Sequence, residues 1–474
     1  MRGAPPRFSD EQVRALLRAC FGAALAAADP SALLPAALPP PPDGKLVVVA
    51  VGKAALPMAR AAWVHYSLQR PEARVEGVVV TPRQPEAAGP VLPSALGTLK
   101  VRSGAHPTPD RSSVAATLEA LRLVAGAAPG DHVLVLLSGG ASALLCAPRG
   151  VDLRTKAELT RTLLAAGATI AELNAVRKHL SRVKGGQLGE LALAQGARLT
   201  TLAISDVAGD DPSTIGSGPS VPDPTTYAEA LEVVERLAPQ HTSARAALAL
   251  GVAGGVPETP KPGDARLAGA DYRLVGGPAA SLAAAAELLR RRGVQVEDLG
   301  PNVEGEARSV GAAHAGLVAE LAASRRPEQR PVALVSGGEL TATVVPPTGS
   351  TAGVGGPNAE YAVALVAQLR ERFGRGGLLP AADAPGAGWA VSVLAADTDG
   401  LDGGGPSSEG GPGGAGALLD ASQVSSLNPA ALTDALARHD SHTLLASVGG
   451  LLVTGATGVN VNDLRVVILL PVSA

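Results

Sequence analysis

Short apolar runs alternate along this chain with longer stretches in which apolar residues recur every three or four positions. The short runs predict strands, and the longer stretches predict amphipathic helices. Strands are predicted at 45–51, 132–137, 198–204, 332–335, 390–394 and 451–454. Helices are predicted at 10–28, 54–67, 112–125, 155–166, 171–180, 279–292, 304–323 and 358–372. This alternation is typical of βαβ units, so the sequence predicts an α/β fold with mainly parallel or mixed sheets.

Proline and glycine indicate where the predicted elements end. Pro30 is predicted to end the first helix, and Gly126 is predicted to end the helix at 112–125. The segment 251–264 is rich in both residues and is predicted to be a linker or exposed loop that contains a domain boundary. A second glycine-rich segment, 403–416, is predicted to be a surface loop.

Composition narrows the class of protein. The 474 residues are enough for two or three domains. The chain has 57 glycines and 39 prolines but only 3 Phe, 2 Trp and 4 Tyr, so the predicted core is aliphatic. The formal net charge of -3 is too balanced to mark the whole protein as a nucleic-acid binder.

Two features indicate the compartment. The cysteines, Cys20 and Cys146, stand in apolar contexts that offer neither a disulfide framework nor a CxxC metal pair, which favours a reducing cytosol. The apolar stretch 15–38 is interrupted by Arg18 and Asp29, and the chain does not begin with a signal-peptide pattern. The sequence therefore predicts a cytoplasmic protein without a membrane segment.

A Ser-Gly-Gly turn follows two of the predicted buried strands. The first turn comprises Ser138, Gly139, Gly140, Ala141 and Ser142, and the second comprises Ser336, Gly337, Gly338 and Glu339. A glycine turn at the carboxyl end of a strand offers backbone N–H groups to an anion, so each turn is a candidate phosphate cradle. The alternative is an ordinary tight turn. Glu339 adds a carboxylate that could orient a metal-bound water or a substrate hydroxyl.

Four cations precede a Gly-Gly pair in the middle of the chain: Arg177, Lys178, Arg182 and Lys184. On a continuous helix Arg177 and Lys184 would share one face, because they are seven residues apart, and both could bind an anionic group. A solvated basic helix face is the alternative.

Carboxylates gather in two loops that follow predicted strands. Asp206, Asp210 and Asp211 follow the strand at 198–204, and Asp399 and Asp402 follow the strand at 390–394. Such clusters suit Mg²⁺, or a base that removes a proton from a hydroxyl. A helix cap or a turn would explain one such aspartate but not three. Together with cations and glycine turns, the clusters favour phosphoryl transfer.

Several familiar signatures are missing from the sequence. There is no GxxxxGK[ST] motif, so this is not a P-loop enzyme, and no GxGxxG motif opens a βα unit, which disfavours dependence on a dinucleotide. The Gly140-Ala-Ser142 segment lacks the last glycine of a nucleophile elbow.

The order of the motifs resembles the glycerate kinases that carry a MOFRL domain, which are also named hydroxypyruvate reductases. The similarity extends from about residue 8 to about residue 471. The matching segments are VGKAA (51–55), LSGGASALL (137–145), NAVRKHLSRVKGG (174–186), SDVAGDDPSTIGSGP (205–219), SGGEL (336–340), TDGLDG (398–403), DSHT (440–443) and TGATGVNVND (454–463).

This resemblance implies two α/β/α domains with the active site in the cleft between them. Residues 8–262 would form the first domain and 263–474 the second, which contains the MOFRL region at about 330–471. The implied activity is the ATP-dependent phosphorylation of D-glycerate to 2-phosphoglycerate, with ATP and Mg²⁺ as cofactors. Neither nucleic acid nor a membrane is an implied partner, and a homodimer is left open.

The resemblance also implies roles for particular residues. Lys53 would bind the substrate carboxylate or neutralise the moving phosphoryl group, and Asp206 would orient or deprotonate the hydroxyl. Asp399 would serve the metal or the substrate. The implied substrate ligands are Arg177, Lys184 and Asn358, the phosphate ligands are Ser138, Gly139, Gly140, Ser142, Gly337, Gly338 and Glu339, and the metal ligands are Asp206, Asp211 and Asp399. His439 and His442 are expected to hold the DSHT turn rather than to shuttle protons.

One departure from the family pattern concerns a stretch that usually reads like GRGGRNQE. Here Val354 and Pro357 stand where the family has arginines, so Arg177, Arg182 or Lys184 would have to replace any phosphate contact that is lost. Two other functions stay open: a hydroxypyruvate reductase that uses NAD(P)H, and a non-catalytic sensor of small hydroxy acids.

Overall fold

The computed structural model describes residues 8–83, 95–325, 329–344, 353–373, 378–380, 388–403 and 413–472. The chain forms two compact units, which we name the central unit (Asp29–Gly277) and the terminal unit (Met1–Ala28 with Pro278–Ala474). The division falls before Pro278, not in the predicted boundary segment 251–264. That segment lies inside the central unit, where Thr259 is buried and donates its hydroxyl to Asp223.

The central unit is built on a mostly parallel sheet in the order β3-β4-β2-β1-β5-β6-β7. Its strands are β1 (Leu46–Val51), β2 (Val75–Pro82), β3 (Ala95–Leu96), β4 (Leu99–Gly104), β5 (His132–Leu137), β6 (Arg198–Ile204) and β7 (Ala270–Gly276). All of them pair in parallel except β3, which is antiparallel to β4. Strands β1 and β5 are buried along their whole length, as expected for a sheet covered on both faces.

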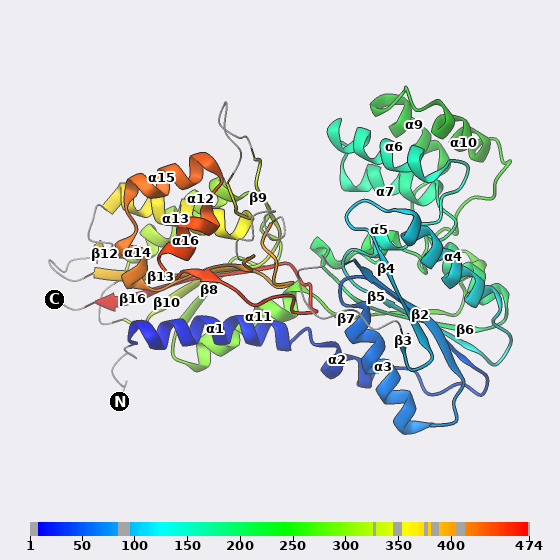
Figure 1. Ribbon diagram of the computed structural model, residues 1–474, viewed down its shortest axis with the longest axis horizontal. Helices are drawn as coiled ribbons and strands as arrows, with labels where there is room; N and C mark the ends of the chain where they lie inside the picture. The colour runs from blue at the N-terminus through cyan, green and yellow to red at the C-terminus, as the bar shows by residue number, and fades with distance from the viewer. Residues whose placement is uncertain are drawn as a thin grey trace. The chain divides into compact units, whose positions relative to one another are not determined.

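Helices cover this sheet, and a group of them forms a smaller core beside it (Figure 1). The helices are α2 (Pro30–Ala37), α3 (Ala55–Gln69), α4 (Arg111–Ala125), α5 (Ala141–Leu144), α6 (Leu153–Ala165), α7 (Ile170–His179), α8 (Gln187–Ala194), α9 (Tyr227–Leu237) and α10 (Thr242–Val252). Short 3₁₀ turns occur at Ala208–Asp210, Ile215–Ser217 and Ala265–Leu267. Helices α6, α7, α9 and α10 share their own apolar cluster, which includes Leu163, Val176 and Val234.

The strand order places a switch point in the centre of this sheet. In chain order the connections run outward from β1 through β2 to β4, and then return to β5 and run outward the other way to β7. The loops after β1 and β5 therefore diverge to opposite sides of the sheet. Ligands of doubly wound folds bind at the carboxyl ends of the strands at such a point.

The terminal unit has a mixed sheet in the order β15-β14-β13-β16-β10-β8, with β12 beside β13. Its strands are β8 (Gln295–Asp298), β10 (Val332–Ser336), β12 (Leu378–Pro380), β13 (Gly388–Asp397), β14 (Gly416–Leu419), β15 (Leu451–Leu452) and β16 (Asp463–Val472), and β9 (Gly305–Glu306) pairs with β11 (Leu340–Thr341). Strand β10 is parallel to β8 but antiparallel to β16.

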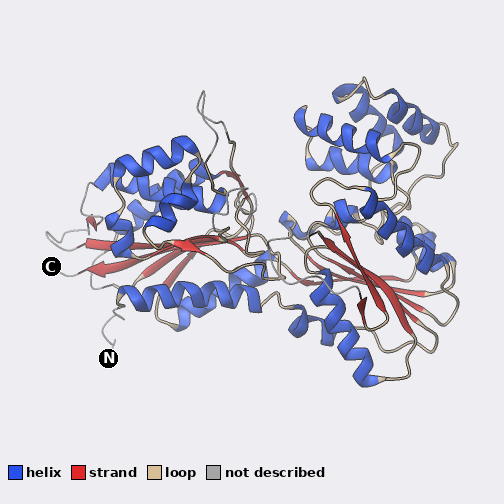
Figure 2. Ribbon diagram, viewed as in Figure 1, coloured by secondary structure: helices blue, strands red, loops and turns tan. Residues whose placement is uncertain are grey.

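Two helix layers enclose this mixed sheet (Figure 2). The helices are α1 (Asp10–Ala26), α11 (Pro278–Arg291), α12 (Ala307–Ala323), α13 (Pro357–Phe373), α14 (Ala421–Ser426), α15 (Pro429–Arg438) and α16 (Ser441–Ser447). Alternate residues of each strand serve opposite cores: Val467 packs with α12 and α13, whereas Val466 and Ile468 pack with α1 and α11.

The predicted α/β fold is confirmed, with parallel strands in one unit and mixed strands in the other. Every predicted strand and helix is present: β5 and β6 have the predicted ends, and the ends of the others are shifted. Gly126 ends α4 as predicted. Strand β16 is absent from the predicted set although its run at 466–470 is apolar. Residues 404–412 of the predicted loop at 403–416 lie outside the described residues.

The prediction for Pro30 is wrong, because this residue begins α2 rather than ending α1. Proline fits the first turn of a helix, where its missing N–H costs nothing. By length and composition the segment Asp10–Ala37 is apolar enough to cross a membrane. In the structure it is two helices, and α1 buries the face that includes Leu17 and Phe21 in the core beside α11.

Candidate active site

Three loops leave the carboxyl edge of the central sheet side by side. Gly52 and Lys53 follow β1, Ser138 follows β5, and Asp206 follows β6 with one residue between. Because β5 lies between β1 and β6 and all three strands are parallel, these loops meet at the same edge of the sheet. The structure thus brings Lys53, the first Ser-Gly-Gly turn and Asp206 to the switch point.

The turns after β1 and β5 are tied together by hydrogen bonds. The Lys53 N–H donates to the Gly139 carbonyl at 2.8 Å, and the Ala54 N–H donates to Ser138 Oγ at 3.0 Å. A Cβ at Gly52 would lie 2.2 Å from Ser138 Oγ, so only glycine allows this approach. The buried Ser138 hydroxyl therefore fixes the two turns to each other.

The backbone of the same turn provides hydrogen-bond donors. Among the described residues, no acceptor binds the N–H group of Gly139 or Gly140. Gly140 has φ 80°, and a Cβ there would lie 3.1 Å from His106 Cδ2 and 3.6 Å from Lys53 Cγ. Two N–H groups without a described acceptor thus belong to a turn that packs against Lys53 and the His106 ring, and unbonded N–H groups in a glycine turn are suited to an anion.

A second glycine turn packs against the first through side chains. Ser142 Oγ lies 3.0 Å from Ser217 Oγ, which donates in turn to Asn174 Oδ1 at 3.1 Å. Lys184 Nζ donates to the Ser142 carbonyl at 2.8 Å and to the Gly216 carbonyl at 3.5 Å. Lys184 is 1% exposed, so it holds the two turns together from the inside.

Lys184 belongs to a group of cations that also contains the buried Lys156 and the half-buried Arg177. The continuous helix that would carry Arg177 to Lys184 does not exist, because α7 ends at His179 and Gly185 and Gly186 have positive φ. The chain nevertheless folds back, so that the charge of Arg177 acts on Lys184. None of the three cations forms an ion pair with a described carboxylate.

Burial dominates the electrostatics of this group. It lowers the pKa of Arg177, and it lowers the pKa of Lys184 well below its ordinary value, with the charge of Lys156 acting in the same direction. Burial also lowers the pKa of Lys156 to about 8. An anionic ligand near these side chains would favour their protonated forms. Lys178, by contrast, forms a buried ion pair with Asp223 at 3.1 Å.

The acidic loop after β6 divides into different environments. Asp206 is half-buried at the end of β6, whereas Asp211 is exposed. Both oxygens of Asp211 accept hydrogen bonds within their own turn, from the Ser213 N–H and from the hydroxyls of Ser213 and Thr214. Burial opposes the ionisation of Asp211, but these bonds outweigh it and lower its pKa. In the described ranges no group of three or more His, Cys, Asp or Glu side chains could hold a metal ion.

The second Ser-Gly-Gly turn, in the terminal unit, is occupied by its own chain. The Gly337 N–H donates to the Gly300 carbonyl at 3.0 Å, and the Asp463 N–H donates to the Gly338 carbonyl at 3.1 Å. Arg465 is buried beneath the turn and donates to Ser336 Oγ at 3.1 Å. Glu339 is exposed.

Asn358 lies in a buried polar network at the start of α13. Its Nδ2 donates to Asp463 Oδ1 at 2.7 Å, and its backbone N–H donates to Asp402 Oδ1 at 2.8 Å. Its Oδ1 has no partner among the described residues. Burial raises the pKa of Asp463 to about 7 against the charge of Arg465, which lies 2.9 Å away.

Asp399 lies in the tight turn after β13. The Leu401 N–H donates to Asp399 Oδ1 at 2.8 Å, and a Cβ at Gly400 would lie 2.0 Å from the Gly455 carbonyl oxygen. The TDGLDG and TGATGVNVND segments therefore form one pair of contacting loops, where β13 ends and β16 begins.

Sequence reasoning missed several residues of these arrangements. His106, Asn174, Ser217 and Lys156 all lie outside the predicted site, as do Asp463 and Arg465. Asn174 and Ser217 fall inside quoted motifs, so their place in those motifs was the available signal. His106 and Lys156 come from unremarkable segments, and only the folded chain brings them to the glycine turns.

Comparisons with known proteins cover almost the whole chain. Residues 16–250 match a family described as a domain of unknown function (DUF4147), and residues 332–463 match the MOFRL family. The D-glycerate 2-kinase of Thermotoga maritima is 35% identical over 423 residues, with 89% of each chain covered. The crystal structure of a Thermotoga maritima glycerate kinase has a TM-score of 0.76 and 31% identity, covering 97% of this chain and 100% of that one.

The chain belongs to the MOFRL-containing glycerate kinase family.

Relatives of this chain carry two kinds of name, hydroxypyruvate reductase and glycerate 2-kinase. A protein of Agrobacterium vitis that is named "Putative hydroxypyruvate reductase" is 39% identical over 471 residues, with 98% of this chain and 96% of that protein covered. A glycerate 2-kinase of Pyrococcus horikoshii is 34% identical over 434 residues, with 90% and 88% covered.

In this glycerate kinase family member, the stretch that contains Val354 is held against the DSHT turn. The Gly353 N–H donates to the Arg438 carbonyl at 2.7 Å, and the Val354 N–H donates to Asp440 Oδ1 at 3.1 Å. His439 Nδ1 lies 3.0 Å from Glu360 Oε2. Val354 and Pro357 are half-buried, and their apolar side chains supply no charge in this stretch.

Proposed function

We propose that this protein transfers a phosphoryl group from ATP to D-glycerate and forms 2-phosphoglycerate. The observation that carries the proposal is the position of the unused Gly139 and Gly140 N–H groups beside Lys53, at the switch point of the central sheet. Relatives with 34% and 35% identity are named glycerate 2-kinase and D-glycerate 2-kinase, which supports the same substrate class.

In this mechanism the Gly139 and Gly140 N–H groups bind phosphate oxygens of the nucleotide. Lys53 neutralises charge on the phosphoryl group as it moves. Asp206 accepts the proton of the substrate hydroxyl while the hydroxyl oxygen bonds to the γ-phosphorus. The bond from that phosphorus to the β–γ bridging oxygen breaks, and ADP leaves.

The cation group is proposed to hold the substrate carboxylate. Lys184 and Lys156 already donate to backbone carbonyls, whereas the guanidinium of the half-buried Arg177 has no hydrogen-bond partner among the described residues. Arg177 is therefore the main carboxylate ligand in this proposal, and Lys184 supports it through its charge. The substrate-related roles that the family resemblance implies for Asn358 and Asp399, which belong to the terminal unit, stay predictions.

Magnesium fits the described donors only if it arrives with the nucleotide. Mg²⁺ is commonly held by one or two carboxylates together with substrate phosphates and water, so a cluster of three protein ligands is not required. Asp206 is the proposed protein ligand in the central unit, and Mg²⁺ would supply charge neutralisation at the phosphates. Asp211 has both oxygens engaged in its own turn, which makes it a weaker candidate.

A coupled assay tests the function. Purified protein with D-glycerate, ATP and Mg²⁺ should form ADP, and phosphorus NMR should identify 2-phosphoglycerate as the product. Formation of 3-phosphoglycerate alone would contradict the choice of hydroxyl. Rapid loss of NADH with hydroxypyruvate would instead support the reductase named in the Agrobacterium vitis relative.

A further inference from the structure

A cavity of about 590 Å³ lies in the central unit outside the candidate active site. Its walls come from α4, from α8 and from the short bridge in which Pro148 pairs with Ser181. None of the residues that the proposed mechanism assigns to phosphate, substrate or metal lines it. Three arginines do: Arg122, Arg149 and Arg182.

The bridge explains why two of these arginines lie side by side. The Arg149 N–H donates to the Leu180 carbonyl at 3.2 Å, and the Arg182 N–H donates to the Ala147 carbonyl at 2.9 Å. On each side of the antiparallel Pro148–Ser181 pair, the neighbouring residues point to the opposite face from that pair. Arg149 and Arg182 therefore share one face, and Arg122 joins them from the last turn of α4.

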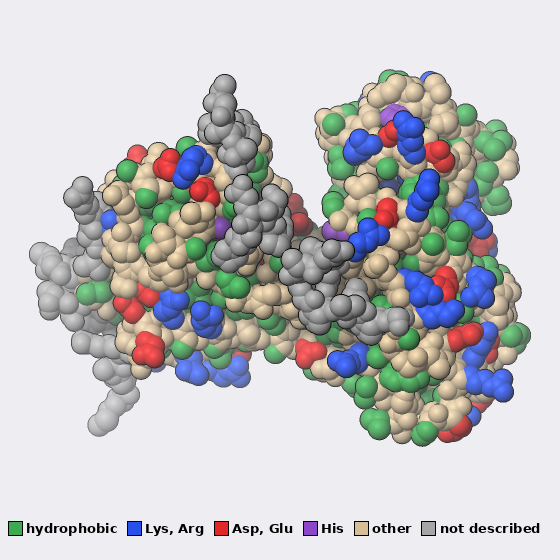
Figure 3. All heavy atoms as spheres, viewed as in Figure 1, with side chains coloured by type: hydrophobic (Ala, Val, Ile, Leu, Met, Phe, Trp, Pro, Cys, Tyr) green, Lys and Arg blue, Asp and Glu red, His purple; other side chains and the backbone are tan. Residues whose placement is uncertain are grey.

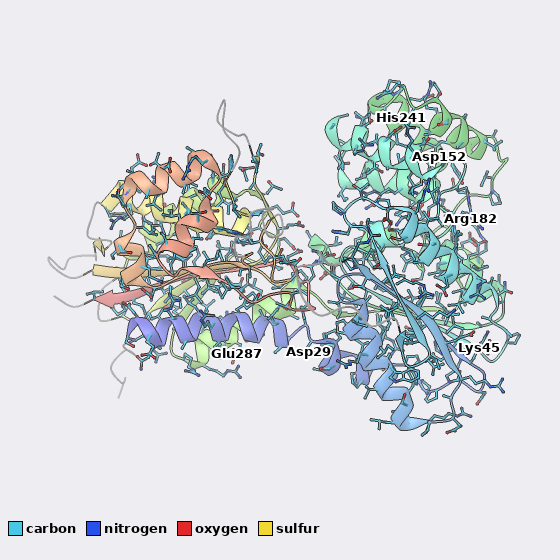
Figure 4. The ribbon with its side chains drawn as sticks, in the orientation of Figure 1. Asp29, Lys45, Asp152, Arg182, His241 and Glu287 are labelled. Atoms are coloured by element: carbon cyan, nitrogen blue, oxygen red, sulfur yellow. The ribbon has the colours of Figure 1, made fainter. Side chains whose placement is uncertain are left out.

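The cavity carries an excess of positive charge. Neither Arg122 nor Arg182 forms an ion pair with any carboxylate in the described ranges. Glu190 also lines the cavity, but its Oε1 lies 3.2 Å from Arg266 Nη1, so its charge is already balanced. Figure 3 shows lysine and arginine side chains gathered on the face of the central unit where Figure 4 labels Arg182.

We propose that this cavity is a second ligand site, which binds a small phosphorylated metabolite. Guanidinium groups bind phosphate through pairs of N–H donors, and three of them more than balance the two negative charges of a phosphate monoester. Leu118, Leu121 and Leu191 supply an apolar wall for the carbon skeleton. A cavity of about 590 Å³ suits a small molecule rather than a polymer.

The ligand would contact the segment that carries Lys184. Arg182 precedes Lys184 by two residues, and Gln187 lines the cavity while its Nε2 donates to the carbonyls of Ser181 and Lys184 at 2.9 and 2.8 Å. Binding at the second site would therefore affect the candidate active site through this segment, because Lys184 donates to the Ser142 carbonyl.

Calorimetric titration with glycerol 3-phosphate and with inorganic phosphate tests the proposal, at constant ionic strength and without nucleotide or glycerate. The R149Q/R182Q variant should bind glycerol 3-phosphate at least about tenfold more weakly than the parent. The matched control is R154Q/R245Q, which removes the same charge from side chains of the central unit that are 85% and 41% exposed, and it should bind as the parent does. If R149Q/R182Q does not fold, R122Q provides the same comparison.

The Lys53→Ala variant separates this site from the proposed function, because phosphate could also bind the turn beside Lys53. That variant should keep the glycerol 3-phosphate binding that R149Q/R182Q loses. The proposal is overturned if Lys53→Ala abolishes all binding, if R149Q/R182Q binds like the parent, or if the parent binds neither probe. If a short single-stranded RNA binds the parent more tightly than glycerol 3-phosphate does, and R149Q/R182Q loses that binding, the ligand of the cavity is a nucleic acid and the metabolite proposal is overturned. None of these results depends on whether the kinase assay succeeds.

Discussion

The two Ser-Gly-Gly turns share a sequence and a position after a buried strand, but their backbone groups are used differently. In the 138–140 turn, no described acceptor binds the N–H of Gly139 or Gly140. In the 336–338 turn the Gly337 N–H donates to the Gly300 carbonyl, and although no described acceptor binds the Gly338 N–H, a Cβ at Gly338 would lie 2.3 Å from the Val303 carbonyl oxygen. The first turn can receive a ligand, whereas the second is largely filled by its own unit.

The strand neighbours explain this difference. Strand β5 lies between parallel strands, so the neighbouring chains all leave at the same edge and diverge at the switch point. Strand β10 lies beside the antiparallel β16, which begins at the edge where β10 ends. Because β16 starts there, Asp463 and Arg465 reach the second turn and occupy its hydrogen-bonding groups. A shared motif therefore indicates a ligand site only where the neighbouring strands leave it open.

The largest expected effect comes from adding a methyl group to each turn. In Gly338→Ala the Cβ would lie 2.3 Å from the Val303 carbonyl oxygen, at φ 101°, so unfolding should become easier by at least about 3 kcal/mol. In Gly140→Ala the nearest atoms are at 3.1 and 3.2 Å in the His106 ring, so the left-handed backbone should cost only about 1–2 kcal/mol. Urea denaturation measures both values. Equal losses would mean that the two turns are equally packed.

The next effect concerns catalysis at the open turn. Lys53→Ala and Asp206→Asn should each lower kcat/KM for glycerate at least about a hundredfold, or about 2.7 kcal/mol, if they act in the transition state. Lys100→Ala is the control, since its side chain is 55% exposed on β4 and should leave kcat/KM within about twofold. Full activity in either test variant would remove the role proposed for that residue.

The smallest expected effect is a pH dependence of stability that is caused by Lys156, in the cation group beside the 138–142 turn. The pKa of Lys156 is about 8 in the folded protein and about 10.5 when the side chain is solvated. Between pH 8 and pH 10.5, Lys156 is therefore protonated in the unfolded chain but mostly deprotonated in the folded chain. Stability should therefore rise with pH in this window, by at most about 1.4 kcal/mol per pH unit from this lysine. Comparing the parent with Lys156→Met from pH 8 to pH 9 should show a shallower slope in the variant. The matched Lys100→Met variant should keep the parental slope, and an unchanged slope in Lys156→Met would contradict the assignment.

Much of the fold could be predicted because burial imposes a periodicity. The continuous apolar runs of β1, β5 and β6 and the amphipathic pattern of α4 are local properties of the sequence. The position of α1 could not be predicted in this way. This helix packs with α11, which is more than 250 residues away along the chain. Nothing in the sequence of α1 indicates that α11 is the helix it packs against.

The candidate site was predictable to the extent that its residues stand at strand ends. Lys53, Ser138 and Asp206 follow three strands that the apolar pattern identifies, and parallel pairing brings them to one edge. The helix argument for Arg177 and Lys184 fails because α7 ends at His179, although burial still brings their charges close enough to interact. His106 carries no local signal, because only the packing of β4 against β2 carries its loop to Gly140.

The sequence by itself determined the class of fold, the ends of the strands and the residues from which a phosphate site could be made, since these follow from periodicity and from the conformational freedom of glycine. The tertiary structure decided which of the two Ser-Gly-Gly turns keeps both glycine N–H groups without a described acceptor, and which cations lie together without a described carboxylate partner. These outcomes depend on the direction of neighbouring strands and on contacts between distant segments, and a local pattern of residues contains no information about either.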